Sequence, residues 1–238
     1  MGEVQPKRRQ RRRVRLALAF ALAALAAPAR ASNEAAREWE VSVAAAREVS
    51  AMEGRSEAGR RYYDVCVSCH LAGGAGDEGG TMPRIGGQHR SVLIKQLLDI
   101  RSGRRRNPVM APYMEALPDL QAIADVATHL AALPVPPSVG RGPGTETARG
   151  ARLYRERCAS CHGARAEGVA ETFSPALQGQ HYRYLVRQLI DIAGVRRDNA
   201  FPAMVEAVSD LSARDVSSIA DFVSRLPAPA SERGGEAR

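Results

Sequence analysis

Cysteine and histidine occur at one fixed spacing in two places along this chain of 238 residues. The first run is Cys66-Val67-Ser68-Cys69-His70, the second is Cys158-Ala159-Ser160-Cys161-His162, and together they use all four cysteines. Two thiols on one helical turn can both reach the vinyl groups of a porphyrin, and the histidine that follows can supply a nitrogen to the iron. The pattern therefore predicts two covalently bound haem c groups, each held by two cysteines and ligated by the adjacent histidine.

Two other interpretations of a Cys-x-x-Cys pair have to be weighed. Such a pair can form a redox disulfide, or it can supply half of a four-cysteine zinc site. Either interpretation leaves the histidine after each pair unexplained, and also the downstream pattern that both copies share. Thioether bonds to haem would also remove the tendency of these thiols to pair in an oxidising compartment. We therefore favour haem attachment over both alternatives.

The positive charge of the chain is concentrated at its start. Residues 1–31 contain eight Lys and Arg against Glu3 alone, so they hold +7 of the formal net charge of +8. A basic segment to Arg15, an apolar run over 16–27 and the small-residue site Ala29-Arg30-Ala31 are typical of a cleavable signal peptide. We expect export to the periplasm, with an uncleaved anchor as the minority alternative. Nucleic-acid binding loses its main support, because the remainder of the chain is close to neutral.

An internal duplication accounts for most of the remaining sequence. Residues 57–134 and 149–227 align at an offset of 92, which places Cys158 on Cys66, Tyr154 on Tyr62 and Gly179-Gln180-His181 on Gly87-Gln88-His89. We predict two domains with these bounds, joined by a Pro- and Gly-rich linker over 135–148. Residues 32–56 form an N-terminal extension, expected to be one or two helical turns packed on the first domain or a partly ordered segment. Residues 228–238 are expected to form a flexible tail.

Each repeat has the apolar periodicity of an all-α unit. Helices are expected to enter the haem motif over 58–65 and 150–157, and a second helix over about 90–103 is repeated in the other copy. The last helix of each unit ends at a proline, Pro134 or Pro227. A domain of roughly 80 residues buries limited core, so an apolar porphyrin would complete each interior.

A second axial ligand is expected in the loop before each last helix. Methionine is favoured in electron carriers, because its thioether stabilises ferrous iron. The second unit offers Met204 alone, whereas the first offers Met110 and Met114. We favour Met110, which follows Asn-Pro within the loop, and Met114 stays open as the alternative. Met82 is disfavoured, because the second unit has Ser174 at that place.

These features together resemble the dihaem cytochrome c4 family over about residues 57–227. The resemblance is carried by the doubled Cys-x-x-Cys-His, by the segments Pro83–Gln88 and Pro175–Gln180, and by the Asn-x-x-Met-type loops. It implies an all-α fold of two tandem cytochrome c-like domains, each wrapped around one covalent haem with His/Met iron. It also implies that the carbonyls of Pro83 and Pro175 orient the proximal histidines. The 32–56 extension departs from the family pattern, and Met204 lies further from its asparagine than Met110 does.

For the remaining histidines we expect structural roles and no iron ligation, and the arginine clusters are left open between functional and structural interpretations. His89 and His181 repeat in register, and we expect a polar helix-start role in preference to iron ligation. His129 is expected to fill an aromatic slot near Tyr62, and Trp39 to be a packing anchor. The clusters 104–106 and 196–197 are interpreted equally as partners of haem propionates, as guides for an acidic partner or as a solvated surface.

The function predicted from these features is single-electron transfer, not catalysis. We expect a periplasmic dihaem carrier that delivers electrons towards a terminal oxidase. Its partners would be redox proteins, either a membrane oxidase or reductase complex or a dehydrogenase, and peripheral membrane association is left open. One alternative is a dihaem peroxidase, which the similarity of the two units disfavours because a peroxidase needs unequal haems. Another is a cytochrome subunit of a dehydrogenase or sulfur-oxidising complex, with 32–56 as the docking piece.

Overall fold

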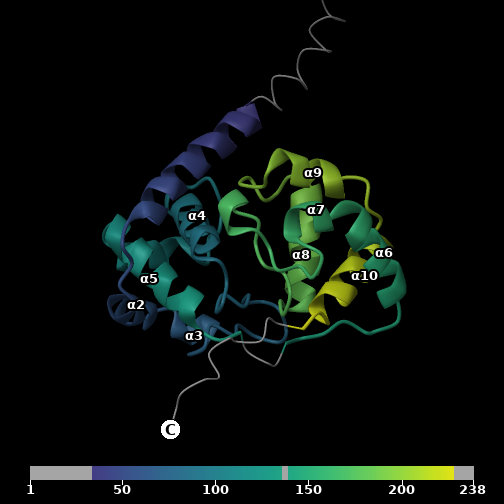
Figure 1. The fold of residues 1–238 in the computed structure, drawn as a ribbon, viewed down its shortest axis with the longest axis horizontal. Coiled ribbons are helices and arrows are strands. Elements are labelled where there is room, and N and C mark those ends of the chain that lie inside the picture. The colour runs from purple at the N-terminus through teal and green to yellow at the C-terminus, as the bar shows by residue number, and fades with distance from the viewer. Residues whose placement is uncertain (1–33, 136–138, 228–238) are drawn as a thin grey trace, which may run out of the picture.

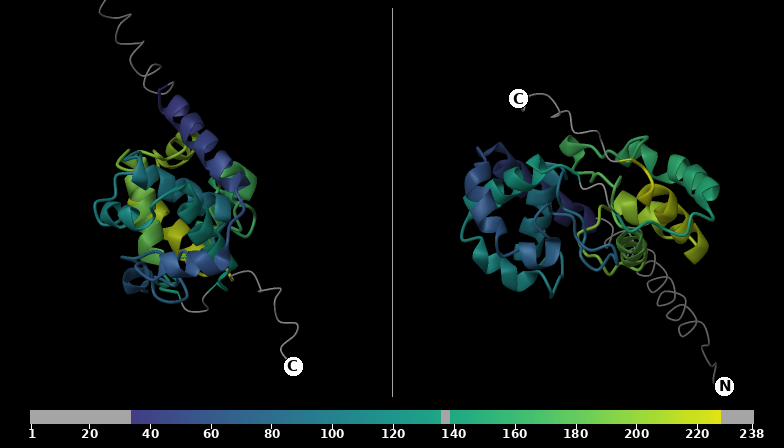
Figure 2. Two further views of the ribbon diagram at one scale, coloured as in Figure 1. Left: turned by 90° about the vertical axis from the view of Figure 1, so that its left-hand side faces the viewer. Right: turned by 90° about the horizontal axis from the view of Figure 1, so that it is seen from below.

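The computed structural model describes residues 34–135 and 139–227, and these are arranged as two groups of helices side by side (Figures 1 and 2). The predicted all-α fold is confirmed: the described residues contain no β-strand, and one antiparallel bridge joins Val169 and Ser174 there. Within the same residues, no helix combines the length and apolar character needed to cross a bilayer. The predicted signal peptide and tail lie outside the described residues.

The main helices follow the same order in both groups, but the first group has an additional N-terminal helix and the short elements between the main helices differ. The first begins with a helix over residues 34–51, followed by α2 (Ser56–Tyr63), α3 (Val67–His70), α4 (Arg90–Arg101), η1 (Ala111–Ala116) and α5 (Leu120–Ala132). The second comprises α6 (Thr147–Arg157), α7 (Ala159–His162), η2 (Ala170–Thr172), α8 (Tyr182–Ala193), α9 (Pro202–Val208) and α10 (Ala213–Ser224). The helices predicted from periodicity are all present, whereas α9 and η1 lie where the sequence predicted only loops.

Glycine lets α2 cross α5, and α6 cross α10, at very short range. A Cβ added to Gly59 on α2 would lie 2.1 Å from the backbone oxygen of Asp125 on α5. At Gly150 on α6 it would lie 1.9 Å from the backbone oxygen of Ser218 on α10. Any larger residue would push the helices apart at these two positions. The crossing fixes the short helices α3 and α7, which carry the cysteine–histidine motifs.

A buried tyrosine links α2, and another links α6, to the end of the motif that follows it. Tyr63 donates a hydrogen bond to the carbonyl of Leu71 at 2.6 Å, and Tyr154 donates to the carbonyl of Gly163 at 2.7 Å. Leu71 and Gly163 directly follow the motif histidines, so Tyr63 is the structural equivalent of Tyr154. The alignment of Tyr154 with Tyr62 was wrong by one residue. Tyr63 lies three positions before Cys66, whereas Tyr154 lies four positions before Cys158, so the fixed offset does not hold ahead of the motifs.

The same tyrosines pack against the last helices. The ring of His129 lies 5.8 Å from that of Tyr63, and the ring of Phe222 lies 5.7 Å from that of Tyr154, between centroids. His129 therefore fills an aromatic slot as predicted, although its partner is Tyr63 and not Tyr62.

The N-terminal helix is longer than the one or two turns expected for this extension. It runs from residue 34 to 51, and its buried side chains Val43, Ala46 and Val49 belong to the same apolar core as α4 and α5. Trp39 is partly buried against this core, which agrees with its predicted packing role. The helix over residues 34–51 is thus an integral part of the first core.

The two groups of helices, residues 34–135 and 139–227, are called the first and second halves below. Equivalent residues of each half form hydrogen bonds with the other half. His89 and His181 begin α4 and α8 as predicted. Their side chains, however, reach across the interface: the His89 Nε2 donates to the carbonyl of Glu167 and the His181 Nε2 to that of Ala75, both at 2.8 Å. These histidines therefore tie the halves together, a role that the sequence did not reveal.

Candidate haem sites

The first Cys-x-x-Cys-His motif is folded as a single tight turn. Cys66 precedes α3, and its carbonyl accepts hydrogen bonds from the amides of Cys69 at 3.2 Å and of His70 at 2.9 Å. The turn brings the two thiols and the imidazole to one side of the unit. Cys158, Cys161 and His162 repeat it around α7 with the same two distances.

The imidazole of each motif is buried and held by one hydrogen bond. His70 Nδ1 donates to the carbonyl of Pro83 at 3.0 Å, and His162 Nδ1 donates to the carbonyl of Pro175 at 3.0 Å. These are the bonds that the family resemblance predicted. Because Nδ1 carries the proton, Nε2 keeps a free lone pair for a metal. Burial lowers the pKa of both histidines, which favours the neutral ring that a metal needs.

A small pocket lies next to the first motif, and its walls suit a haem edge. It is lined by Val65, Cys66, Cys69, His70, Met82, Val109, Met110 and Tyr113. Two thiols, an imidazole and a thioether are the donor set of a His/Met c-type haem, and the other walls are largely apolar. The residues present therefore fit the predicted group.

The two candidate methionines of the first unit lie in different surroundings. Met110 lines the pocket with His70, and its amide donates to the carbonyl of Asn107 at 3.1 Å. Met114 is only 7% exposed and belongs to the apolar core. Met82 also lines the pocket, at a position for which the second unit has no methionine.

The methionine of the second unit is presented differently. Met204 lies on α9, partly buried against the second core. Its amide donates to the carbonyl of Phe201 at 2.8 Å, whereas Met110 lies just before η1. Asn199, which the duplication aligns with Asn107, donates a hydrogen bond to Asp99 of the first half at 2.7 Å. The longer spacing in the second loop thus accompanies a contact between the halves.

Burial also suppresses ionisation of one thiol in each motif. It raises the pKa of Cys66 and of Cys158 to about 11 each. The two cysteine pairs contribute to separate clusters, with Cys66 packed against the first core and Cys158 in the second. A single zinc shared by both pairs does not match this placement.

The arginine clusters are engaged in contacts within and between the halves. Arg105 donates to Gln96 at 2.8 Å, and Arg197 donates to Gln188 at 2.8 Å and across the interface to Gln96 at 3.1 Å. The remaining three, Arg104, Arg106 and Arg196, form ion pairs with Glu38, Asp198 and Asp191. The solvated-loop interpretation is therefore wrong for Arg105 and Arg197, whereas the side chains of Arg106 and Arg196 are 75% and 58% exposed, as that interpretation expects.

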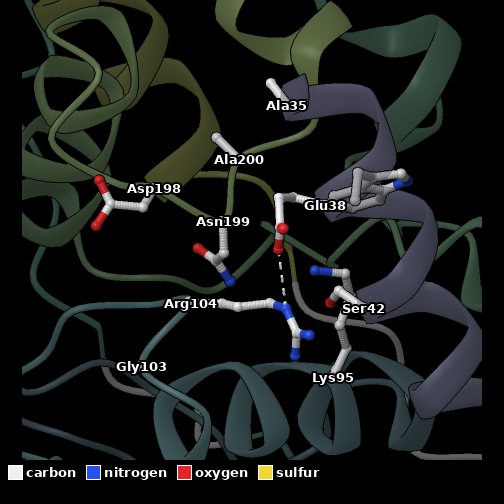
Figure 3. Close-up of a pocket in the computed structure, with 10 residues that line it drawn as sticks. Ala35, Glu38, Ser42, Lys95, Gly103, Arg104, Asp198, Asn199 and Ala200 are labelled. Atoms are coloured by element: carbon white, nitrogen blue, oxygen red, sulfur yellow. Dashed lines mark hydrogen bonds and ion pairs between the residues drawn. The ribbon is translucent and has the colours of Figure 1, made fainter. Parts of the chain in front are cut away.

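A buried polar cluster that the sequence did not reveal joins the N-terminal helix to both halves. Asp99 accepts hydrogen bonds from Lys95 at 2.7 Å, from Ser42 at 2.5 Å and from Asn199 at 2.7 Å. The Lys95 ammonium lies 4.0 Å from the ring centroid of Trp39. Figure 3 shows the N-terminal helix, the end of α4 and the second-half loop around one small pocket. Since the charges are paired here, the cluster fastens the extension to the interface.

Arg84 is a second feature that sequence reasoning missed. It is 2% exposed, and its guanidinium donates to the carbonyls of Gly86, Gln178 and Gly179. Burial lowers its pKa to about 10. The residue follows Pro83 directly, and the duplication aligns it with Ala176. The first site therefore has a buried cationic side chain close by where the second has a methyl group.

Comparisons with known proteins agree with this geometry. Residues 147–227 match the family model for cytochrome c. Cytochrome c4 of Pseudomonas aeruginosa is 30% identical over 183 residues, 73% of this chain and 89% of that protein. The thiosulfate dehydrogenase electron acceptor of Stutzerimonas stutzeri is 34% identical over 173 residues, 68% of this chain and 79% of that protein. The crystal structure of reduced recombinant cytochrome c4 from Pseudomonas stutzeri superimposes with a TM-score of 0.67 at 26% identity, covering 74% of this chain and all of that one.

The helical fold, the twin motifs and the family match define a c-type cytochrome with two covalently bound haem c groups. Such a protein transfers single electrons. Identity and coverage identify the subgroup as well: the chain belongs to the cytochrome c4 family.

Proposed function

We propose that the chain is a periplasmic electron carrier in which each domain, residues 57–134 and 149–227, holds one six-coordinate haem. Cys66 and Cys69 would form the thioethers of the first haem, and His70 and Met110 would be the iron ligands. Cys158, Cys161, His162 and Met204 would take the same roles in the second. The observation that carries this proposal is the repeated hydrogen bond from a motif histidine to a proline carbonyl, at 3.0 Å in both halves.

The residues around the motifs have distinct tasks in this function. Iron in the bound haem supplies the one-electron chemistry. The proline carbonyls fix the orientation of His70 and His162, and the buried helix crossings hold the motif turns in place. Apolar walls exclude water at the first site, and the thioethers of Met110 and Met204 would close the two sites to small oxidants. No general base or nucleophile is needed, so we propose no catalytic residue.

Export is part of this proposal. The segment 1–31 would direct the chain across the inner membrane, and the thioethers would form afterwards on the exported chain. Pulse labelling that detects a precursor, and a mature N-terminus at Ser32, would test the cleavage site.

Redox partners would dock where the first motif approaches the surface. Three apolar side chains around this pocket are exposed, Val65, Val109 and Tyr113, and Val109 is 55% exposed. A patch of this kind beside a haem edge suits a transient complex, in which a partner approaches closely enough for electron transfer. We propose a dehydrogenase as the donor, since one relative is named as the electron acceptor of thiosulfate dehydrogenase. The acceptor would be a terminal oxidase of the membrane.

Rapid mixing of the oxidised protein with a reduced dehydrogenase tests the proposal. We expect reduction that is saturable and that slows for Val109→Glu, while Val195→Glu, exposed at 65% in the other half, leaves the rate unchanged. The peroxidase alternative predicts instead that one haem binds carbon monoxide or cyanide rapidly. Such binding in the wild-type protein, with peroxide turnover, would overturn the carrier assignment.

A further inference from the structure

Gln180 of the second half forms hydrogen bonds with the peptide group that orients His70 of the first half. The carbonyl of Pro83 accepts the hydrogen bond from His70 Nδ1, and the N–H of the same peptide group belongs to Arg84. This N–H donates to Gln180 Oε1 at 3.0 Å. Gln180 Nε2 donates in return to the carbonyl of Arg84 at 2.9 Å. His70 is thus connected through one peptide group to a side chain of the other half.

The opposite connection is built in the same way. The carbonyl of Pro175 accepts the hydrogen bond from His162, and the N–H of that peptide group, on Ala176, donates to Gln88 Oε1 at 2.9 Å. Gln88 Nε2 donates to the carbonyl of Ala176 at 2.9 Å. Gln88 and Gln180 are 8% and 5% exposed, so the hydrogen bonds of both side chains are shielded from water.

These glutamines are also fixed from their own side. Gln88 Oε1 accepts a second hydrogen bond from the amide of His89 at 2.9 Å, and Gln180 Oε1 accepts one from the amide of His181 at 3.0 Å. Each side chain is therefore held by its own helix start while it binds the opposite peptide. A side chain fixed at both ends acts as a rigid electrostatic contact, since none of its partners is free to reorient.

We propose that Gln180 and Gln88 are positioning residues that set the donor strength of His70 and His162, so that each half tunes the iron of the other. The inference rests on the axial ligation proposed above. A peptide group is conjugated, so a hydrogen bond from its N–H increases the electron density on its carbonyl oxygen. A more negative carbonyl holds the Nδ1 proton more strongly and makes Nε2 a better donor. A better imidazole donor stabilises ferric iron, which lowers the reduction potential.

The proposal predicts a crossed response to substitution. Gln180→Leu removes the acceptor from the Arg84 amide, so the potential of the first haem rises while that of the second stays unchanged. Gln88→Leu raises the potential of the second haem alone. Redox titration of the holoprotein followed by NMR gives both values, because the methyl resonances of each haem are assigned through contacts with their own domain. In the reduced protein, the Nδ1 proton of the opposite histidine should also move upfield.

Ser91→Ala is the matched control. Ser91 donates to the carbonyl of Ala170 across the same interface at 2.7 Å but touches neither orienting peptide, so both potentials should remain as in the wild type. Alanine replaces leucine at positions 88 and 180 if a leucine variant does not accumulate, since it removes the same acceptor.

A shift at the haem of the substituted half, equal shifts at both haems, a lowered potential or no shift would each overturn the proposal. The thioether–iron absorption band of the same samples reports the His/Met ligation separately. If that band is intact and the crossed response is missing, the glutamine inference fails and the proposed function stands. If the wild-type protein has no such band, the ligation proposed above fails first.

Discussion

Substitutions at Met110 and Met114 can separate iron ligation from core packing, because each should affect one of the two and leave the other largely unchanged. Met114 is 7% exposed within the first core, so Met114→Ala leaves a cavity and should lower the free energy of unfolding by about 2–5 kcal/mol. It should leave the iron ligands in place. Met110 lines the pocket beside His70 and is only partly buried, so Met110→Ala should cost less in packing but open the first iron.

The assay combines three readings on each purified holoprotein. The ferric spectrum should keep its full thioether–iron band in Met114→Ala and lose about half in Met110→Ala, because one of two equivalent ligands is gone. Carbon monoxide should bind the reduced Met110→Ala protein alone, and guanidinium unfolding should show the larger loss of stability in Met114→Ala. Loss of half the band in Met114→Ala, with a normal band in Met110→Ala, would refute the assignment. Met204→Ala is the matched change in the second half and should also halve the band.

Three further predictions concern stability. Gly59→Ala should destabilise the protein by about 1–3 kcal/mol in urea unfolding, because the new Cβ meets the backbone of α5 at 2.1 Å and this overpacking outweighs a helix-propensity gain of about 1 kcal/mol. Gly73→Ala, where a Cβ meets nothing within 4 Å, should change stability by less than about 0.5 kcal/mol, and equal losses in both would contradict the packing argument. Trp39→Ala should cost about 1–3 kcal/mol through its lost cation–π and aromatic contacts and should make the N-terminal helix sensitive to protease, so an unchanged cleavage pattern would count against its docking. Hydrogen bonds from Ser212 and Arg149 lower the pKa of Asp215 below its ordinary 3.8, so its stabilisation is present above pH 3.8 and is lost as the pH falls through the folded-state pKa. Asp215→Asn should therefore lower the free energy of unfolding by less than about 1 kcal/mol at neutral pH, and this loss should disappear in acid. A loss of stability that is independent of pH would exclude this charge effect.

Sequence alone located the motifs, the duplication and the helices that carry regular apolar periodicity. Cys-x-x-Cys-His has few competing explanations when it is repeated, and the proline carbonyl bonds followed from the family resemblance. The same reasoning left Met110 and Met114 open, because the loops differ in length. Burial separates the two residues, and burial depends on tertiary packing that no local pattern encodes.

Most of the features that were missed depend on contacts between distant segments. The N-terminal helix has only a few apolar positions, yet three of them reach the first core. The change of offset at Tyr63 is a single-residue difference in the spacing from the tyrosine to the first motif cysteine, which an alignment at one fixed offset cannot represent. Gln88 and Gln180 repeat in register, but a helix-start role explains that repetition equally well. Only the facing of the two halves shows that each glutamine binds the other half's orienting peptide.

The intact mass of the acid-denatured mature protein shows whether two haems are bound covalently to the chain. Thioether bonds survive denaturation, so we expect one species with the mass of the chain plus two haems, and a mass without both haems would contradict covalent attachment at both motifs. Cys158→Ala combined with Cys161→Ala should reduce this to one haem. A wild-type mass equal to the bare polypeptide, or to the polypeptide with a single haem, would contradict the account.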